Sequence, residues 1–221
     1  MAEPKIESSF LVGLDLGQAR DPTAIGVIER ALMPSDRFEL NDAGEPTRAL
    51  QAVYRLRHLM RPQLGTSYVQ IVETVAGMLS KPELVGAELV VDFTGVGAAV
   101  TDMLRKAGLN PVAVYIHGGD KVTARDGGGF NVPKRDLAGV MQMLLQTRRL
   151  HIRQSMPLAE VFMRELLNFR VKVNIATGHD SYEALREGDH DDLVLAVAMA
   201  CWFGEQPEPP RGMGQTQLLP F

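Results

Sequence analysis

The sequence has little cysteine, no long apolar run and no excess of basic residues. Its 221 residues include one cysteine, Cys201, so an internal disulfide framework and a zinc site built from thiolates are excluded. No apolar run is long enough to span a membrane, and Met1 to Ser9 lack the apolar core of a signal peptide. We therefore expect a soluble protein of the cytoplasm.

The charge balance and the apolar content limit the protein further. The formal net charge is −4, so the chain has no overall basic surface with which to coat nucleic acid. A nuclease is not excluded, because the acidic residues of such an enzyme gather at its metal site. Apolar residues make up 45% of the chain, which suffices for one buried core. We expect one domain over residues 10–205, between a flexible N-terminus (1–9) and a disordered tail rich in proline and glycine (206–221).

Short apolar runs alternate with helical patterns, which predicts an α/β fold. The runs predict strands at residues 10–17, 23–29, 54–59, 88–92, 111–116, 150–152 and 170–173. Helical spacing predicts helices at residues 65–79, 98–107, 134–148, 158–168 and 187–202. Segments 34–50 and 117–133 are expected to be loops because of their glycine and proline. A tight turn joins the first two strands and a helix joins two later ones, so the central sheet should be mixed, antiparallel first and then parallel, with helices flanking it.

Two aspartates stand at the ends of buried strands. Asp15 and Asp92 each close an apolar run. In an open α/β sheet, binding sites form at the carboxyl ends of the strands. A buried acid costs free energy unless its charge is solvated or bound, and a divalent cation meets this need because Mg²⁺ takes carboxylate oxygens as ligands. The sequence therefore predicts a metal site at this edge of the sheet.

The helix expected over 187–202 begins with further acids. Asp189, Asp191 and Asp192 directly precede an apolar run, and a capping role that suits the helix dipole is the simplest alternative to metal binding. Asp192 shares a helix face with apolar residues, so we expect it to point at the sheet as the main ligand, with Asp191 as a second ligand and Asp189 as the cap. Three or four carboxylates would suit two cations. His190 is expected to be a solvated or capping residue, with a contact to water or phosphate as the alternative.

Four groups of motifs occur in an order and spacing that extend through residue 203. They are Gly13-Leu14-Asp15-Leu16-Gly17 with Asp21-Pro22-Thr23-Ala24; Tyr54-Arg55-Leu56 with Gly65-Thr66-Ser67-Tyr68; Val90-Val91-Asp92-Phe93-Thr94-Gly95-Val96-Gly97 with Asp102-Met103-Leu104; and His190-Asp191-Asp192-Leu193-Val194-Leu195-Ala196. With these motifs the chain resembles the nuclease domain of tailed-phage large terminase subunits, an RNase H-like fold shared with Holliday-junction resolvases. The resemblance implies an acidic triad of Asp15, Asp92 and Asp192 with Asp191 beside it, two Mg²⁺ or Mn²⁺ ions, and endonuclease cutting of concatemeric phage DNA in a bacterial host.

The chain departs from the family in one respect. Large terminases carry a packaging ATPase, but the sequence has no Gly-x-x-x-x-Gly-Lys-Ser/Thr phosphate loop, so we expect a nuclease without that ATPase. The resemblance still implies DNA as the substrate and the packaging ATPase, the small terminase subunit and the portal as partners. Residues Gln217–Phe221 loosely resemble peptides that dock on bacterial sliding clamps, although a tail without a partner is the simpler interpretation.

Basic residues give a weaker indication of where DNA would bind. Lys121 and Arg125 lie in a glycine-rich segment, and Lys134 and Arg135 follow it. Flexible basic loops near a metal site can contact a phosphate backbone, although each of these residues can equally be a solvated surface charge. Nothing in the sequence indicates base readout, so cleavage should be weakly sequence-specific.

Three other functions are open. A resolvase of the same fold would cut branched DNA rather than linear duplex. A kinase or chaperone of the actin-like superfamily would use Asp15, Leu16 and Gly17 in a phosphate-binding hairpin, but that architecture needs two related domains and a longer chain. A non-catalytic nucleic-acid-binding relative would keep the fold without metal-dependent cutting, and the intact acids argue against it.

Overall fold

An eight-stranded mixed sheet forms the centre of the computed structural model, which describes residues 8–17, 21–41, 43–95, 98–126, 128–171 and 190–207. The strand order is β6-β7-β5-β4-β1-β2-β3-β8. The strands are β1 (Ser8–Asp15), β2 (Ala24–Leu40), β3 (Pro46–Met60), β4 (Glu88–Asp92), β5 (Val112–His117), β6 (Thr123–Ala124), β7 (Phe130–Pro133) and β8 (Leu150–Ile152). The helices are α1 (Tyr68–Leu79), the short 3₁₀ helix η1 (Pro82–Leu84), α2 (Ala98–Lys106), α3 (Lys134–Gln146), α4 (Ala159–Val171) and α5 (Asp192–Gly204).

The strand directions confirm the mixed sheet that the sequence predicts. The first three strands pair antiparallel, whereas β4 runs parallel to β1, β5 to β4, and β7 to β5. Because β1, β4 and β5 run in the same direction, their carboxyl ends lie at one edge of the sheet. Asp15, Asp92 and His117, the last residues of these strands, therefore stand along that edge.

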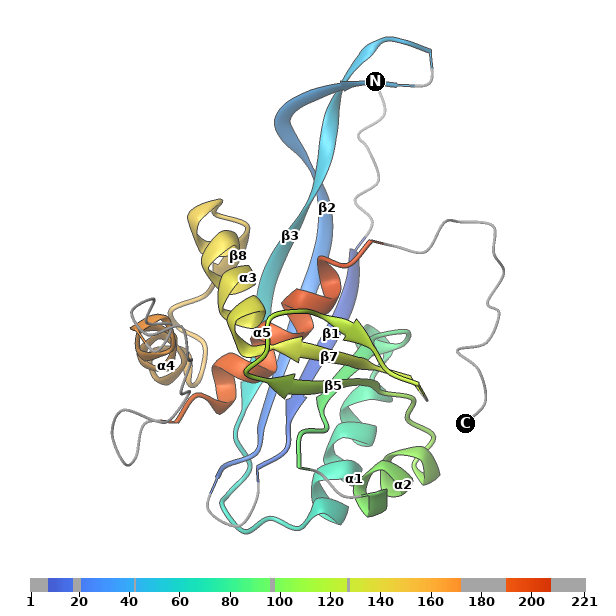
Figure 1. Cartoon of the computed structure of the whole chain (residues 1–221), viewed down its shortest axis with the longest axis vertical. Helices are drawn as coiled ribbons and strands as arrows, with labels where there is room; N and C mark the ends of the chain where they lie inside the picture. The colour runs from blue at the N-terminus through green and yellow to red at the C-terminus, as the bar shows by residue number, and fades with distance from the viewer. Residues whose placement is uncertain are drawn as a thin grey trace.

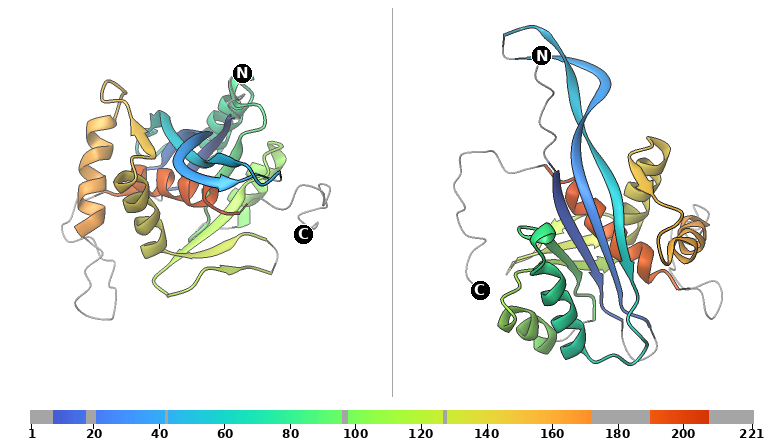
Figure 2. Two further views of the ribbon diagram at one scale, coloured as in Figure 1. Left: turned by 90° about the horizontal axis from the view of Figure 1, so that it is seen from above. Right: turned by 180° about the vertical axis from the view of Figure 1, so that it is seen from behind.

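Helices cover both faces of the sheet and enclose two apolar layers. Helices α3, α4 and α5 lie on one face and α1 and α2 on the other (Figures 1 and 2). Helix α5 packs directly on β1 and β2, and all of its residues except Phe203 are buried. A Cβ atom at Gly13 of β1 would lie 1.8 Å from the carbonyl oxygen of Ala196, so glycine is required for this close approach. The packing fixes α5 across the sheet.

The expected loop at 34–50 is wrong, because β2 and β3 continue through it as a two-stranded ribbon. The ribbon projects beyond the rest of the sheet (Figure 1). Its turn is closed by the side chain of Asn41, which accepts hydrogen bonds from the backbone N–H groups of Ala43 (3.0 Å) and Glu45 (2.8 Å). Pro34 is tolerated within β2 because the strand register shifts next to it.

Two further expectations need correction. Segment 117–133 is not one loop, because it contains β6 and β7. Residues 170 and 171 belong to helix α4 and not to a strand, while residues 172 and 173 of that expected strand lie outside the described residues. The other expected strands and the five expected helices are present, but the helix expected over 187–202 begins only at Asp192, since residues 190 and 191 are not helical and residues 187–189 lie outside the described residues. Ser67 begins α1 with a capping box completed by Gln70. No helix within the described ranges is both long enough and apolar enough to cross a membrane.

Candidate metal centre

Four aspartates from three elements interact at the carboxyl edge of the sheet. Asp15 ends β1, Asp92 ends β4, and Asp191 and Asp192 lie at the start of α5. Asp15 is buried, with 8% of its surface exposed. Burial, followed by the negative charges of Asp92, Asp192 and Asp191, raises the pKa of Asp15 well above its usual value, while Lys134 lowers it. The fold thus gathers the four candidate ligands into one electrostatic cluster.

The two strand-end aspartates have few partners. Within the described parts of the chain, no hydrogen bond or ion pair is formed by the Asp15 carboxylate. The Asp92 Oδ1 atom accepts a hydrogen bond from the backbone N–H of Thr94 (2.7 Å). Burial raises the pKa of Asp92, although the Thr94 hydrogen bonds and the charge of Lys134 partly offset this. Neither acid is neutralised by a direct ion pair with a described residue.

The pair of acids at the start of α5 is arranged differently, because each contacts a cation. The Lys134 Nζ atom donates to Asp191 Oδ2 at 2.7 Å. The Arg61 Nη2 atom lies 3.5 Å from Asp192 Oδ2. Burial is the main reason that the pKa of Asp192 rises to about 6, and Arg61 opposes this shift. Lys134, a candidate for DNA contact, is therefore placed inside the acidic cluster.

Arg61 and Glu165 belong to this centre but were not predicted. Arg61 follows β3 and donates through Nη2 to Glu165 Oε1. Glu165 lies on α4 and is 5% exposed. The sequence does contain a sign of Glu165. It is an acid on the same helix face as Phe162, Leu166 and Phe169, and helical periodicity predicts that this face is buried in the core.

The other acidic and histidine candidates lie at the margin of the centre. His190 is exposed, and its Nδ1 atom lies 3.6 Å from Asp192 Oδ2. Asp189, the expected cap, lies outside the described residues. Asp191 holds the N-cap position of α5, but its side chain makes no capping hydrogen bond. The carboxylate of Asp191 is directed to Lys134 instead.

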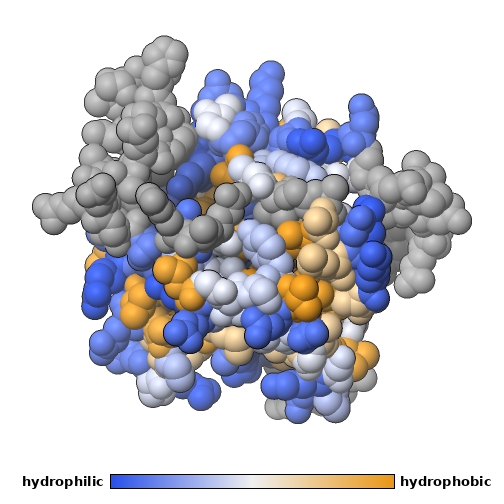
Figure 3. Space-filling view, turned by 90° about the horizontal axis from the view of Figure 1, so that it is seen from below, coloured by the Kyte–Doolittle hydropathy of each residue, from blue (hydrophilic) through white to orange (hydrophobic). Residues whose placement is uncertain are grey.

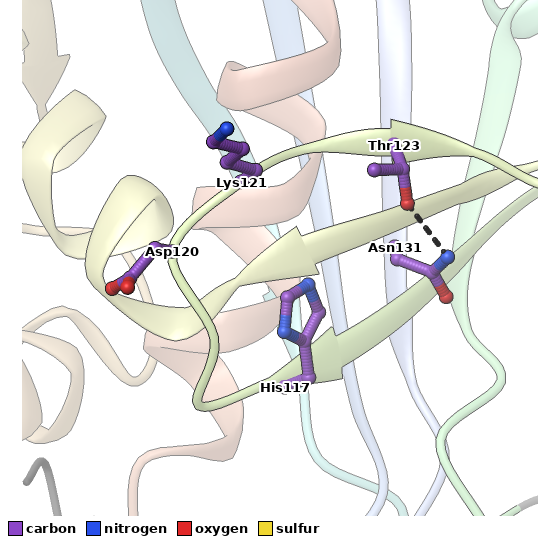
Figure 4. Close-up of a pocket in the computed structure, with 5 residues that line it drawn as sticks. All are labelled: His117, Asp120, Lys121, Thr123 and Asn131. Atoms are coloured by element: carbon purple, nitrogen blue, oxygen red, sulfur yellow. Dashed lines mark hydrogen bonds between the residues drawn. The ribbon is translucent and has the colours of Figure 1, made fainter.

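The remaining candidates for DNA contact lie beside β5 and β7. Lys121 lines a hollow of about 560 Å³ together with His117, Asp120, Thr123 and Asn131 (Figure 4). Arg125 donates to Asn131 Oδ1 (2.9 Å) and stacks over the Tyr115 ring at 3.8 Å. Arg135 forms an ion pair with Asp120. Seen from below, hydrophilic and hydrophobic side chains are interspersed over the surface, without one continuous apolar patch among the coloured residues (Figure 3).

The chemistry of the four acids fits a divalent cation. The donor set consists of buried and half-buried carboxylates whose charges repel one another, which is the environment that hard cations neutralise. As they stand, no three acidic, histidine or cysteine side chains of the described residues are grouped closely enough to hold one ion. The ion pairs of Asp191 and Asp192 with Lys134 and Arg61 engage two of the donors. Metal binding would require Asp191 to exchange Lys134, its hydrogen-bond partner, for the ion.

Comparisons with known proteins identify the fold. No protein-family model matches the sequence, and the search of curated proteins gave no match either. The structure is similar to the crystal structure of the large terminase nuclease from thermophilic phage G20c, with a TM-score of 0.54, 19% sequence identity, and coverage of 88% of this chain and 81% of that chain. The nuclease domain of g2p, the large terminase of bacteriophage SPP1, was solved with bound Mn and gives a TM-score of 0.46, 14% identity, and coverage of 87% and 84%. The similarity to the G20c nuclease confirms the RNase H-like fold implied by the sequence motifs.

Proposed function

We propose that the chain is a metal-dependent endonuclease that hydrolyses DNA phosphodiester bonds by a two-metal mechanism. The observation that carries this proposal is Asp15, a buried acid at a strand end whose pKa is raised by burial and by three neighbouring carboxylates. Holding such a cluster charged is costly, and a bound cation removes the cost. The fold shared with a terminase nuclease supports the same reaction class.

The chain supplies the groups that this chemistry needs. Asp15, Asp92, Asp191 and Asp192 would hold Mg²⁺ or Mn²⁺. When bound, the two ions would activate water for in-line attack and stabilise the leaving oxygen. Lys134, which donates to Asp191, would face the negative charge of the substrate phosphate once Asp191 turned to the metal.

The biological setting is part of the proposal. A terminase-like nuclease would cut phage DNA during packaging in the bacterial cytoplasm, beside a packaging ATPase, a small terminase subunit and a portal. Lys121, Arg125 and Arg135 would contact the DNA backbone next to the metal centre. The clamp-binding hypothesis for residues 217–221 lies outside the described residues and stays a separate proposal.

Plasmid cleavage tests the site. We expect the wild type to cut supercoiled plasmid in Mn²⁺ or Mg²⁺ and not in EDTA. The substitutions Asp15→Asn, Asp92→Asn and Asp192→Asn, singly and combined, should abolish cutting. Asp102→Asn on the exposed side of α2 is the matched control and should cut normally. If the triple variant cuts as well as the wild type, the site assignment is wrong.

The substrate is tested with the same protein. A preference for linear duplex over a four-way junction supports a packaging nuclease, whereas the reverse preference supports a resolvase. Hydrolysis of ATP without any cutting would favour the actin-like alternative. Metal-dependent DNA binding without cutting would favour a non-catalytic relative.

A further inference from the structure

Glu165 contacts the part of the molecule that presents two of the candidate metal ligands. Helix α5 begins at Asp192, and its first N–H groups have no partner within the helix. The N-cap residue does not satisfy them, because the Asp191 carboxylate is bonded to Lys134. Instead, Glu165 Oε2 accepts hydrogen bonds from the N–H groups of Leu193 (3.0 Å) and Val194 (3.4 Å). A side chain of α4 therefore caps α5 from outside.

The cap is a buried charge that Arg61 balances. Glu165 is 5% exposed, and an isolated carboxylate in such a place would be costly. The same Nη2 atom of Arg61 that donates to Glu165 Oε1 lies 3.5 Å from Asp192 Oδ2. Arg61, Glu165 and the first turn of α5 thus form one connected unit, which we call the α5 clamp.

The α5 clamp lies at the first turn of α5, away from the close contact of the helix with β1. Gly13 and the apolar core hold the middle of α5 against β1. Asp192 lies at the helix end, where its carboxylate is oriented by its neighbours. Hydrogen-bonded groups behind metal ligands fix their orientation, and their loss typically costs about 10- to 100-fold in metal affinity or activity. The clamp contacts both the backbone that carries Asp192 and its side chain.

We propose that Glu165, with Arg61 as its counter-ion, is the positioning residue that orients Asp192 for metal binding. The proposal deepens the nuclease function and rests on it. Neither residue needs to touch the substrate. Replacing Glu165 with glutamine keeps an acceptor oxygen for the α5 amides but places an NH₂ group against the Arg61 donor, so the unit should loosen without leaving a cavity.

The test measures Mn²⁺ affinity without DNA, by calorimetry or electron paramagnetic resonance, and cleavage kinetics with DNA. Glu165→Gln should weaken Mn²⁺ binding about 10-fold and lower kcat by a similar factor, while KM for DNA changes by less than about twofold. Arg61→Met should act in the same direction, and Arg61→Lys should restore part of the loss because it keeps the charge. Glu160→Gln, the same change at an exposed position of α4, should behave as the wild type.

Several outcomes would overturn the proposal, and circular dichroism first verifies that each variant is folded. Unchanged Mn²⁺ affinity in folded Glu165→Gln would reduce Glu165 to a structural cap. Tighter Mn²⁺ binding by Arg61→Met would make Arg61 a competitor for Asp192 and not part of a clamp. If the wild type cuts DNA and Glu165→Gln cuts equally well, the positioning role of Glu165 is wrong, whereas the proposed nuclease function is still supported. A wild type that neither binds Mn²⁺ nor cuts defeats both.

Discussion

The two ends of helix α5 carry acids in opposite situations. At its N-terminal end, Asp192 is buried among other acids, and its pKa rises to about 6. Just beyond its C-terminal end, Glu205 accepts hydrogen bonds from Arg149 (2.9 and 2.7 Å) and from the Tyr54 hydroxyl (2.7 Å). Burial alone would raise the pKa of Glu205, but these partners hold it below its usual value. One helix thus joins an acid whose charged form is disfavoured, chiefly by burial, to an acid whose charged form is stabilised by its hydrogen-bond partners.

This difference separates a candidate site from an anchor. An acid whose charged form is favoured by the fold contributes to stability, as Glu205 does. An acid whose charged form is disfavoured reduces stability and gains from any added cation, as Asp192 and Asp15 do. Both kinds of acid are partly or fully buried, so burial alone would not distinguish them. The difference is that the hydrogen-bond partners of Glu205 outweigh the effect of burial on its pKa, whereas the partners of Asp192 do not.

The largest expected effect is at the N-terminal end of α5. Asp192→Asn should lower metal-dependent cleavage at least about 100-fold, because metal ions stabilise such transition states by several kcal/mol. The metal-free variant should be no less stable than the wild type at pH 7.5, since the substitution removes a charge that the fold disfavours. Cleavage assays and thermal unfolding in EDTA measure the two quantities. A clearly lower Tm in EDTA would contradict the comparison.

At the C-terminal end we expect the reverse result. Glu205→Gln weakens the interactions with Arg149 and Tyr54, so it should cost about 2–3 kcal/mol of stability, a fall in Tm of roughly 5–10 °C. The specific cleavage activity of the folded variant should equal that of the wild type, because Glu205 lies at the opposite end of α5 from the candidate metal centre. Thermal unfolding and cleavage at 20 °C measure this. Lost activity with an unchanged Tm would show that the ends are not separate in function.

A substitution of Lys134 tests whether this lysine occupies the place of a metal ion at the N-terminal end of α5. Because Lys134 pairs with Asp191 at 2.7 Å and lowers the pKa values of Asp15 and Asp92, Lys134→Met removes a charge that a metal ion would otherwise have to replace. We expect Mn²⁺ to bind about 3- to 10-fold more tightly, the size of an effect worth roughly 1 kcal/mol. Lys121→Met, a lysine outside the acidic cluster, is the control. Equal affinities in all three proteins would mean that Lys134 does not compete with metal.

The sequence allowed part of this centre to be predicted, because strand ends and helix starts are local features. Asp15 and Asp92 were found from apolar runs that stop at an acid, and parallel strands then bring such ends to one edge. Arg61 directly follows β3 and Glu165 lies within α4, so neither stands at a strand end or a helix start where a site would be sought. Their contacts with each other and with α5 exist only in the tertiary structure. A buried acid on an apolar helix face is the one local sign that could have led to Glu165.

The fold shows the same limit. The antiparallel start and the parallel continuation of the sheet follow from connection lengths, which are local. The long β2–β3 ribbon was missed because its turn-forming residues and Pro34 indicate loops, whereas pairing between the two strands overrides that preference. Strands β6 and β7 were missed for a similar reason, since glycine dominates the segment before β7.

The smallest expected effect is the pH dependence of stability without metal. The pKa of Asp192 is about 6 in the folded protein and 3.8 ordinarily, so the folded state binds the proton more tightly. Stability in EDTA should therefore rise as the pH falls from 7.5 to 5, and the raised pKa values of Asp15 and Asp92 act in the same direction. Glu205 acts in the opposite direction, but only below its usual value of 4.5, and His58, whose pKa burial lowers from 6.5, offsets part of the rise within this range. We expect an increase of about 1 kcal/mol, or roughly 2–4 °C in Tm.

Added Mn²⁺ should raise Tm more at pH 7.5 than at pH 5, because protons compete for the same oxygens. Asp192→Asn should flatten the rise in EDTA, and a Tm that falls steadily from pH 7.5 to 5 in the wild type would contradict the assignment of unsatisfied acids to this end of α5.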